Sequence, residues 1–524
     1  MSDGKTLKSS SNRCSTDPET NRTHRMPQTR ANLLLITTDQ QRGDCLGCAG
    51  HPVLETPYLD ELAEQGAYLP HAYTSVPSCT PARAGIITGM DQWHHGRLTM
   101  TGNDALEYPA TLPGELAKAG YHTQAVGKMH HAPQRRRYGF DHMVLDESGR
   151  RDSGFVSDYH QFFERHKEGE YGYRDHSIDW NSWMARSSHL PEHLHPTYWT
   201  ASEGIKFVEQ RDPSQPFFMW LSFARPHSPY DPPKTYWDMY DDHPDIPAPF
   251  VGDWAGEFDK KVADTNAPRT RRSDSETRKG RTGYYGNITF IDHQIGRFLY
   301  EFKKRDPQAY AETLIIFTSD HGDMMGDHHH WRKTYAYEGS ARVPFIMRYP
   351  QSWDLPCNTR IEAPVELRDI MPTLLDAAGV EIPESVDGAS LLKLARGERD
   401  GWRDFVQGEH TSCYTFEHGM QYVTDGLEKY IWFHHTGCEQ FFDLQEDPGE
   451  CRDLSADPAH AARVALWRKR LAELNERRGD PRGRGEELVP QPDGALSLSP
   501  NYARWKERAQ AQERDWRGPK VGDV

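Results

Sequence analysis

The stretch Asn32-Leu33-Leu34-Leu35-Ile36-Thr37-Thr38-Asp39-Gln40 is a run of apolar and β-branched residues that ends in two polar ones. A strand without alternating polar residues is typical of a parallel sheet that helices cover on both faces. In such sheets, ligands bind beyond the carboxyl ends of the strands. At that position Asp39 can cap a following helix or supply an oxygen ligand to a divalent cation. The stretch therefore predicts an α/β fold and a candidate metal ligand.

Two further apolar runs, 216–223 and 313–318, have the same character and also end in polar residues. The first is followed by Arg225-Pro226-His227 and the second by Ser319-Asp320-His321. Asp and neutral His both ligate divalent metals, and neighbours at a strand-to-loop turn can converge on one ion. A lone histidine such as His227 is more often structural, and that alternative stays open. We expect a mixed, largely parallel central sheet, flanked by helices, with these residues at one edge.

A short motif, Ser78-Cys79-Thr80-Pro81-Ala82-Arg83-Ala84-Gly85, lies between the first two runs. Pro81 suits the first turn of a helix that we expect to run to Gly89. Cys79 would then lie at the helix N-terminus, where the helix dipole and unpaired N–H groups favour anionic atoms. Arg83, one turn later, is placed to reach back toward the same point. The alternative is an ordinary buried thiol, because cysteine is among the most buried residue types.

Lysine and histidine follow the predicted strand at 122–126, as Lys128 and His130. Residues two apart on an extended backbone face the same side, so we expect both side chains to point toward one site. A solvated lysine and a structural histidine are the alternative. The segment Trp331-Arg332-Lys333, which follows the third apolar run, supplies another cation.

The character of the sequence changes near residue 395. Shorter segments at 421–424, 430–433 and 440–444 predict an antiparallel sheet, and a charged helix follows near 458–478. We therefore expect a smaller C-terminal α+β subdomain beside the α/β domain. The predicted divisions are a disordered N-terminal extension at 1–30, a catalytic domain at 31–395, the C-terminal subdomain at 396–480 and an extended tail at 481–524.

The composition argues against two classes of protein. A formal net charge of −16 disfavours general nucleic-acid binding, which needs a basic surface. No apolar run approaches the roughly 20 residues that span a bilayer, so no membrane anchor is expected. Eight irregularly spaced cysteines indicate free thiols in a reducing compartment. The region before Arg30 lacks the apolar core of a secretory signal, so we expect a cytoplasmic protein; a different start codon with a periplasmic export signal is the alternative.

Two stretches are strongly basic: 135–137, and a proline- and charge-rich insertion at 240–282. Most such runs are solvated loops, but long loops in compact domains also form binding sites. If they contact substrate, they could hold an anionic group. The basic residues are Arg135, Arg136, Arg137, Arg269, Arg271, Arg272, Arg278, Lys279 and Arg281.

In their order along the chain, these motifs resemble those of the sulfatase family, within the alkaline-phosphatase-like superfamily. The resemblance covers about residues 32–454 and includes the late segments 440–444 and 447–450. It implies an alkaline-phosphatase-like α/β fold and hydrolysis of a sulfate ester with release of inorganic sulfate. The matching segments are 32–40, 79–89, 127–130, 226–229, 319–323 and Lys333.

The resemblance implies that a maturation enzyme oxidises Cys79 to Cα-formylglycine (3-oxoalanine). One hydroxyl of the aldehyde hydrate attacks sulfur to form a sulfate ester, and deprotonation of the other expels sulfate and regenerates the aldehyde. The implied roles are metal binding by Asp39, Gln40, Cys79, Asp320 and His321, charge stabilisation by Lys128, Lys333 and Arg83, protonation of the leaving oxygen by His227, and proton abstraction for sulfate release by His130.

Two residues depart from the commonest family pattern. Many sulfatases have Asp where this chain has Gln40, and Asn where it has His321; both changes resemble the choline-sulfatase and phosphonate-monoester-hydrolase branch. An amide removes a negative charge from the ion's ligands, and imidazole suits transition metals better than Ca²⁺. The resemblance implies Ca²⁺, and these two departures make Mn²⁺ the alternative.

The expected substrate is the sulfate ester of a carbohydrate, bound through the basic stretches. The alternative activity is that of a phosphonate monoester or phosphodiester hydrolase of the same superfamily. Lys128 and His130 argue against it, because those hydrolases tend to lack this element. A non-catalytic relative would have lost the nucleophile or the metal ligands, and this chain retains both. No feature of the sequence predicts an oligomeric state.

Overall fold

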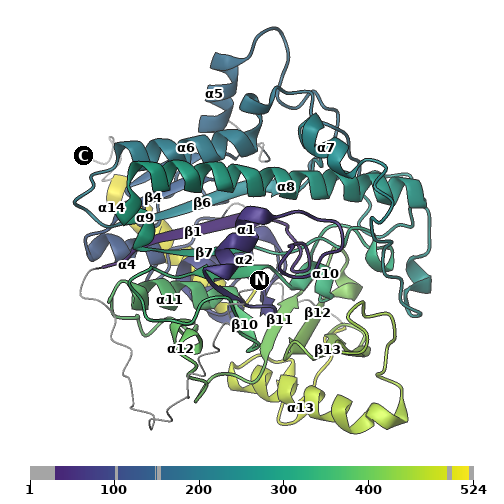
Figure 1. The fold of residues 1–524 in the computed structure, drawn as a ribbon. Helices are drawn as coiled ribbons and strands as arrows, with labels where there is room; N and C mark the ends of the chain where they lie inside the picture. The colour runs from purple at the N-terminus through teal and green to yellow at the C-terminus, as the bar shows by residue number, and fades with distance from the viewer. Residues whose placement is uncertain (1–29, 101–103, 148, 150–154, 493–497, 518–524) are drawn as a thin grey trace, which may run out of the picture.

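The protein is described by a computed structural model that covers residues 30–100, 104–147, 149, 155–492 and 498–517. The predicted extension at 1–30 therefore lies outside the described residues, apart from Arg30. An eight-stranded sheet in the order β5-β4-β6-β1-β7-β8-β2-β9 forms the centre of the molecule (Figure 1). Its strands are β1 (Asn32–Asp39), β2 (Gly66–Tyr68), β4 (His122–Gly127), β5 (His142–Leu145), β6 (Phe217–Pro226), β7 (Thr313–Ser319), β8 (Phe345–Arg348) and β9 (Thr359–Arg360).

The sheet is mixed and largely parallel, as predicted. Strands β5, β4, β6, β1 and β7 run parallel, whereas β8 is antiparallel to both β7 and β2. Leu33 of β1 pairs with Phe218 on one side and with Leu314 on the other. Because three neighbouring strands share this register, their polar carboxyl ends meet at one edge of the sheet.

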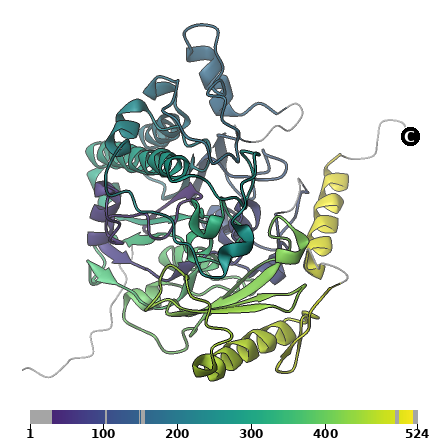
Figure 2. The ribbon, with the colours of Figure 1, turned by 90° about the vertical axis from the view of Figure 1, so that its right-hand side faces the viewer.

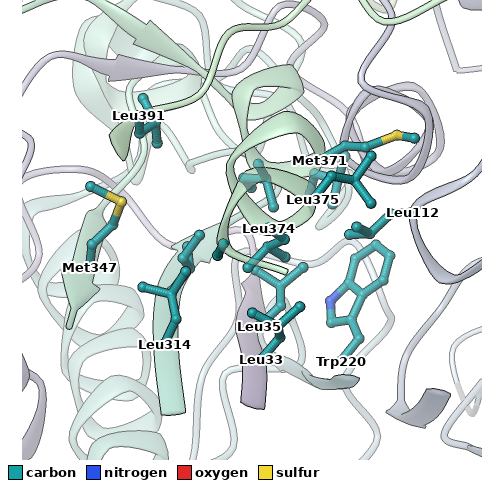
Figure 3. Packing of buried hydrophobic residues seen from close by; sticks show 14 of the residues in the cluster. Leu33, Leu35, Leu112, Trp220, Leu314, Met347, Met371, Leu374, Leu375 and Leu391 are labelled. Carbon is teal, nitrogen blue, oxygen red and sulfur yellow. The ribbon is translucent and has the colours of Figure 1, made fainter. Parts of the chain in front are cut away.

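Alternate residues of β1 enter two hydrophobic cores, one on each face of the sheet. Leu33 and Leu35 pack toward α2 (Cys79–Thr88), α4 (Leu112–Lys118) and α11 (Ile370–Ala377), as Figure 3 shows for Leu33, Leu35, Met371 and Leu374. Leu34 and Ile36 pack toward α1 (Pro57–Glu64), α6 (Pro196–Gln210) and α8 (Asp274–Arg305). Each leucine fully buried in this way contributes about 1.5–3 kcal/mol. The strand is therefore apolar throughout because both of its faces are covered.

The predicted insertion at 240–282 ends earlier than its composition suggests, because α8 begins at Asp274. Ser273 caps the helix and forms a capping box with Glu276. Gly283 lowers the helix propensity of this segment, so the sequence pattern does not indicate the first turns of α8. Its missing side chain is required, since a Cβ there would lie 2.8 Å from the carbonyl oxygen of Tyr230.

The predicted antiparallel sheet is confirmed. It consists of β11 (Val406–His410), β12 (Met420–Thr424), β13 (Glu428–Phe433) and β14 (Glu439–Asp443) in that order. Helix α13 (Ala461–Arg477) covers its outer face (Figure 2), where Trp467 and Leu471 pack on Val423 and Tyr430. Its inner face packs against the α/β domain through residues such as Tyr422.

The prediction of an extended tail at 481–524 is wrong for the described part of that segment. Strands β15 (Gly483–Arg484) and β16 (Glu487–Leu488) pair, and helix α14 (Pro500–Arg517) follows. Tyr502 and Trp505 lie three residues apart, one turn of helix, and pack against Met90 and Tyr108. Two aromatic residues in a charged segment are enough to dock this helix. No helix in the described ranges is long and apolar enough to cross a membrane.

Candidate active site

A cavity of about 350 Å³ opens beyond the carboxyl ends of the parallel strands. Five of the residues predicted to act in catalysis line it, together with Arg332 and the aromatic side chains of Trp180 and Tyr414. The tertiary structure thus brings together groups from the start of α2, the ends of β4 and β6, and the loop after β7. The five predicted residues are Cys79, Lys128, His130, His227 and Lys333.

Cys79 is the first residue of α2, and its side chain is buried at the floor of the cavity. Its Sγ lies 3.1 Å from Lys333 Nζ and 3.3 Å from His321 Nε2. Burial and the Asp39 carboxylate raise the pKa of the thiol, but Lys333 and Lys128 lower it further, so it lies below its ordinary value. The position therefore favours a negatively charged atom on residue 79.

Three other predicted metal ligands meet at this thiol. One donor atom from each of Asp39, Cys79, Asp320 and His321 lies within 4.8 Å of all the others, and all four residues are buried. His321 Nδ1 lies 2.9 Å from the carbonyl oxygen of Gly322, so Nδ1 carries the hydrogen and Nε2 presents a lone pair to the group. Two carboxylates and an imidazole are a donor set for a divalent cation.

Gln40, the fifth predicted ligand, is held by Asp323. Its Nε2 donates to Asp323 Oδ2 at 2.5 Å, and its backbone N–H donates to Asp320 Oδ1 at 3.1 Å. Its Oε1 is buried and has no hydrogen-bond partner among the described residues. A buried carbonyl oxygen without a donor is costly unless something else binds it. The unpaired oxygen therefore fits a cation at this point.

Lys128 and Arg83 both lie against the carboxylates. Lys128 Nζ forms an ion pair with Asp39 Oδ2. Burial raises the pKa of Asp39, but the charges of Lys128 and Lys333 outweigh it and hold that pKa well below its ordinary value. Arg83 Nε donates to Asp320 Oδ2 at 3.0 Å, and the guanidinium does not line the cavity. Arg83 therefore positions carboxylates of the candidate metal group, and its predicted contact with the transferred group is not part of this geometry.

The two histidines at the cavity differ in how they are held. His227 Nδ1 lies 2.9 Å from the carbonyl oxygen of Ser228 and its Nε2 lies 2.9 Å from Lys333 Nζ. Burial and Lys333 lower the pKa of His227 well below its ordinary value, so it is neutral and accepts from the lysine. His130 reaches the cavity differently from the prediction: β4 ends at Gly127, and His130 has a left-handed φ of 59°.

The basic stretches singled out in the sequence do not line this cavity. Arg135 forms an ion pair with Asp158, Arg136 with Glu107, and Arg281 with Asp327. Each of these guanidinium groups is therefore neutralised within the protein. The expectation that the basic stretches bind a second anionic group of the substrate is not supported at this cavity, because none of their residues lines it.

Sequence reasoning missed three contributors. Asp323 orients Gln40, His410 at the end of β11 places Nε2 3.2 Å from the Ser78 hydroxyl, and Tyr414 lines the cavity. The last two come from the C-terminal subdomain, which thus completes the site. Only Asp323 left a signal in the sequence, since it lies two residues after His321. Ser78 and His410 are 332 positions apart, and no local pattern indicates their contact.

The chain matches two family models. The one described as Sulfatase matches residues 31–380, and the one described as N-sulphoglucosamine sulphohydrolase, C-terminal, matches residues 326–477. The chain is 42% identical over 474 residues to an arylsulfatase of Clostridium perfringens, covering 88% of this chain and 97% of that protein. It is 24% identical over 512 residues to an N-acetylglucosamine-6-O-sulfatase of Bacteroides thetaiotaomicron, covering 85% and 86%.

A solved structure has the same fold over most of its length. The phosphonate monoester hydrolase of Agrobacterium radiobacter superposes with a TM-score of 0.72 at 26% identity. The match covers 86% of this chain and 96% of that chain.

Proposed function

The chain belongs to the sulfatase family and hydrolyses sulfate esters, and we propose that its nucleophile is a formylglycine made from Cys79 and that its substrate is a sulfated carbohydrate. The observation that carries the first part is the position of the Cys79 side chain. It lies at a helix N-terminus, between Lys333 and His321, at the floor of the cavity. Any atom that replaces this sulfur is held against a cation and beside the metal-binding group.

The formylglycine hydrate would supply two hydroxyls, one to attack sulfur and one whose deprotonation expels sulfate. A maturation enzyme that oxidises the cysteine is therefore an expected partner. Lys333 Nζ, 3.1 Å from the thiol sulfur, would stabilise the nucleophile in its anionic form. Lys128 lies on the other side, paired with Asp39, and would offset charge on the transferred group.

We assign metal binding to Asp39, Gln40, Asp320 and His321. A divalent cation held there would lower the pKa of the attacking hydroxyl and polarise the sulfate oxygens. Three of the four side chains offer oxygen, which favours Ca²⁺, and the imidazole keeps Mn²⁺ as the alternative. Arg83, bonded to Asp320, would keep that carboxylate in place whether or not the ion is bound.

Proton transfer falls to the two cavity histidines. His227 is neutral and shares a hydrogen with Lys333, so this pair can deliver a proton to the leaving oxygen. His130 lines the same cavity and would take the proton whose removal releases sulfate. One role donates a proton and the other removes one, and a separate imidazole is available for each.

Two observations bear on the substrate. One relative is named for a sulfated amino sugar, and another is named an arylsulfatase. Both names favour a leaving group that is an alcohol or a phenol, but they do not agree on a single compound. The fold of a phosphonate monoester hydrolase keeps that activity as the second candidate. Lys128 and His130 line the cavity here, and they are the residues that those hydrolases tend to lack.

Mass spectrometry of the peptide that contains residue 79, combined with turnover, tests this proposal. The peptide from active enzyme should show the mass loss of thiol-to-aldehyde conversion, in proportion to sulfate released from 4-nitrophenyl sulfate. Phenyl phosphonate monoesters, assayed in parallel, should be turned over more slowly. An unmodified cysteine in fully active enzyme would disprove the nucleophile, and a preference for the phosphonate would favour the second candidate.

A further inference from the structure

Three consecutive residues, Arg332, Lys333 and Thr334, all line the catalytic cavity. On an extended strand, consecutive side chains would point to opposite sides. Here Arg332 and Thr334 have left-handed φ values of 69° and 81°, which turn the backbone so that neighbours face the same space. Such a conformation is unfavourable for residues other than glycine and persists only where surrounding contacts impose it.

Fixed contacts hold this segment on both sides. The backbone N–H of Arg332 donates to Asp323 Oδ1 at 2.9 Å, and that of Thr334 donates to the carbonyl oxygen of Pro77, also at 2.9 Å. The other carboxylate oxygen, Asp323 Oδ2, accepts a hydrogen bond from Gln40 Nε2. The backbone at Arg332 is therefore tied to the carboxylate that orients a metal ligand.

The guanidinium of Arg332 is also held in one place. Its Cζ lies 4.5 Å above the ring of Tyr414, and Nη2 donates to the carbonyl oxygen of Asn266 at 2.5 Å. Stacking on a ring and bonding to a carbonyl orient the planar group without neutralising it. The side chain is half-buried and lines the cavity, and its Nε is buried with no hydrogen-bond partner among the described residues.

The charge of Arg332 is uncompensated within the described part of the chain, where no carboxylate forms an ion pair with it. This sets it apart from Arg135, Arg136 and Arg281, which face Asp158, Glu107 and Asp327. A preoriented guanidinium with no carboxylate partner is suited to bind an oxyanion through two parallel N–H groups. Because Lys333 contacts the nucleophile position, Arg332, the residue before it, is placed to bind a neighbouring part of the same substrate.

We propose that Arg332 binds a second oxyanion of the substrate, a carboxylate or a second sulfate, and thereby selects dianionic sulfate esters. The inference rests on the proposed sulfatase activity at this cavity and adds the substrate class. The C-terminal subdomain takes part, since Tyr414 supplies the ring on which the guanidinium stacks.

The test compares three aryl substrates: phenyl sulfate, 4-sulfooxybenzoate and benzene-1,4-diyl bis(sulfate). The wild type should have a higher kcat/KM for at least one dianionic substrate than for phenyl sulfate, and the preferred one identifies the oxyanion. In Arg332→Gln this preference should fall about 10-fold to 100-fold, mainly through KM, because a charge-assisted bidentate contact is lost. Arg332→Lys keeps the positive charge but not the paired N–H groups of the guanidinium, so the preference for the dianionic substrate should fall less in this variant. The preference should also weaken with salt.

Arg272 provides the matched control. It stacks 4.4 Å from the ring of Trp183 and donates to the carbonyl oxygen of Asp264, but it does not line the cavity. Arg272→Gln should leave the preference unchanged. A wild type that turns over phenyl sulfate without preferring either dianion would overturn the inference alone. So would an equal loss on all three substrates in Arg332→Gln. Absence of turnover on phenyl sulfate would overturn the proposed function, and this inference with it.

Folding of the variants is checked by thermal unfolding. If Arg332→Gln does not fold, Arg332→Lys carries the test, and an undiminished preference in that variant would overturn the inference.

Discussion

Two buried ionic clusters in this protein are built on different rules. Behind the C-terminal sheet, Lys429 Nζ donates to Glu338 Oε1 at 2.7 Å, to Glu450 Oε1 at 2.9 Å and to the carbonyl oxygen of Ala336 at 2.9 Å. All three donors of the ammonium are used, and no part of it reaches solvent. This cluster is saturated by its own hydrogen bonds.

The cluster at the catalytic cavity is not saturated. Gln40 Oε1 has no partner in the described parts of the chain, and Arg332 faces the cavity without a carboxylate. Unsatisfied polar groups are costly, and they mark places where a ligand completes the structure. The comparison shows that charge alone does not locate a site. The catalytic cluster differs from the Lys429 cluster because some of its hydrogen-bonding groups at the cavity have no partner in the protein.

The largest expected effect is on the catalytic cluster. Cys79→Ala removes the proposed nucleophile and should lower kcat/KM on an aryl sulfate by at least about 10⁴-fold, because no other group replaces it. The free energy of unfolding, measured with urea, should change by less than about 2 kcal/mol. Retention of a tenth of the activity would contradict the assignment of this residue.

The saturated cluster should respond in the opposite way. Lys429→Met leaves Glu450 buried without its cation, while Glu338 keeps its ion pair with Arg342, and the change should cost about 3–5 kcal/mol of stability. Lys234→Met is the matched control, since Lys234 pairs with Asp238 on an exposed helix surface and should cost less than about 0.5 kcal/mol. Equal losses in the two variants would show that the buried cluster does not stabilise the fold.

A divalent cation should stabilise the unsaturated cluster alone. At a concentration 100 times its Kd, Ca²⁺ or Mn²⁺ should raise the free energy of unfolding by about 2.7 kcal/mol, and the rise should vanish in Asp320→Asn. Asp387→Asn is the control, because Asp91, His94 and Asp387 form the other candidate group among the described residues. Arg368 lies 3.7 Å from Asp91 there, and its charge opposes a cation. A cation effect that survives in Asp320→Asn would place the ion elsewhere.

Asp292 is a third case, a buried carboxyl that forms no ion pair among the described residues. It accepts hydrogen bonds from the N–H groups of Leu59 and Tyr58 at the start of α1, and burial raises its pKa to about 8. Its folded pKa lies above its unfolded value of 3.8, so the folded state binds the extra proton. Stability should therefore fall as pH rises between about 4 and 8, by on the order of 1 kcal/mol per pH unit.

Asp292→Asn removes this titration, so its stability should fall less between pH 5 and pH 7 than that of the wild type. Urea unfolding at the two pH values measures the difference. Parallel pH profiles for the two proteins would mean that the carboxyl is ionised in the folded state.

Local pattern was sufficient for the central strands of the sheet and for many of the site residues. The apolar runs that become β1, β6 and β7 each end in the polar residues that reach the cavity or the metal-binding group. Covalent adjacency carries this information, because a residue that follows a buried strand must lie at the sheet edge. The start of α8 and the helix α14 were not predicted. Glycines at the start of α8 and the many charges of α14 disfavour a buried helix in the local pattern, and both segments are packed by residues far away in the sequence.

By itself, the sequence determined an α/β protein with Asp39, Cys79, Asp320 and His321 at strand or helix ends, since periodicity and adjacency are local properties. Tertiary structure alone decided which cations are neutralised. Arg135 and Arg281 meet carboxylates, whereas Arg332 stacks on Tyr414 from the other subdomain and keeps its charge at the cavity. The physical reason is that ion pairing depends on distances between groups that are separated in the sequence, and only the packing of the folded chain sets those distances.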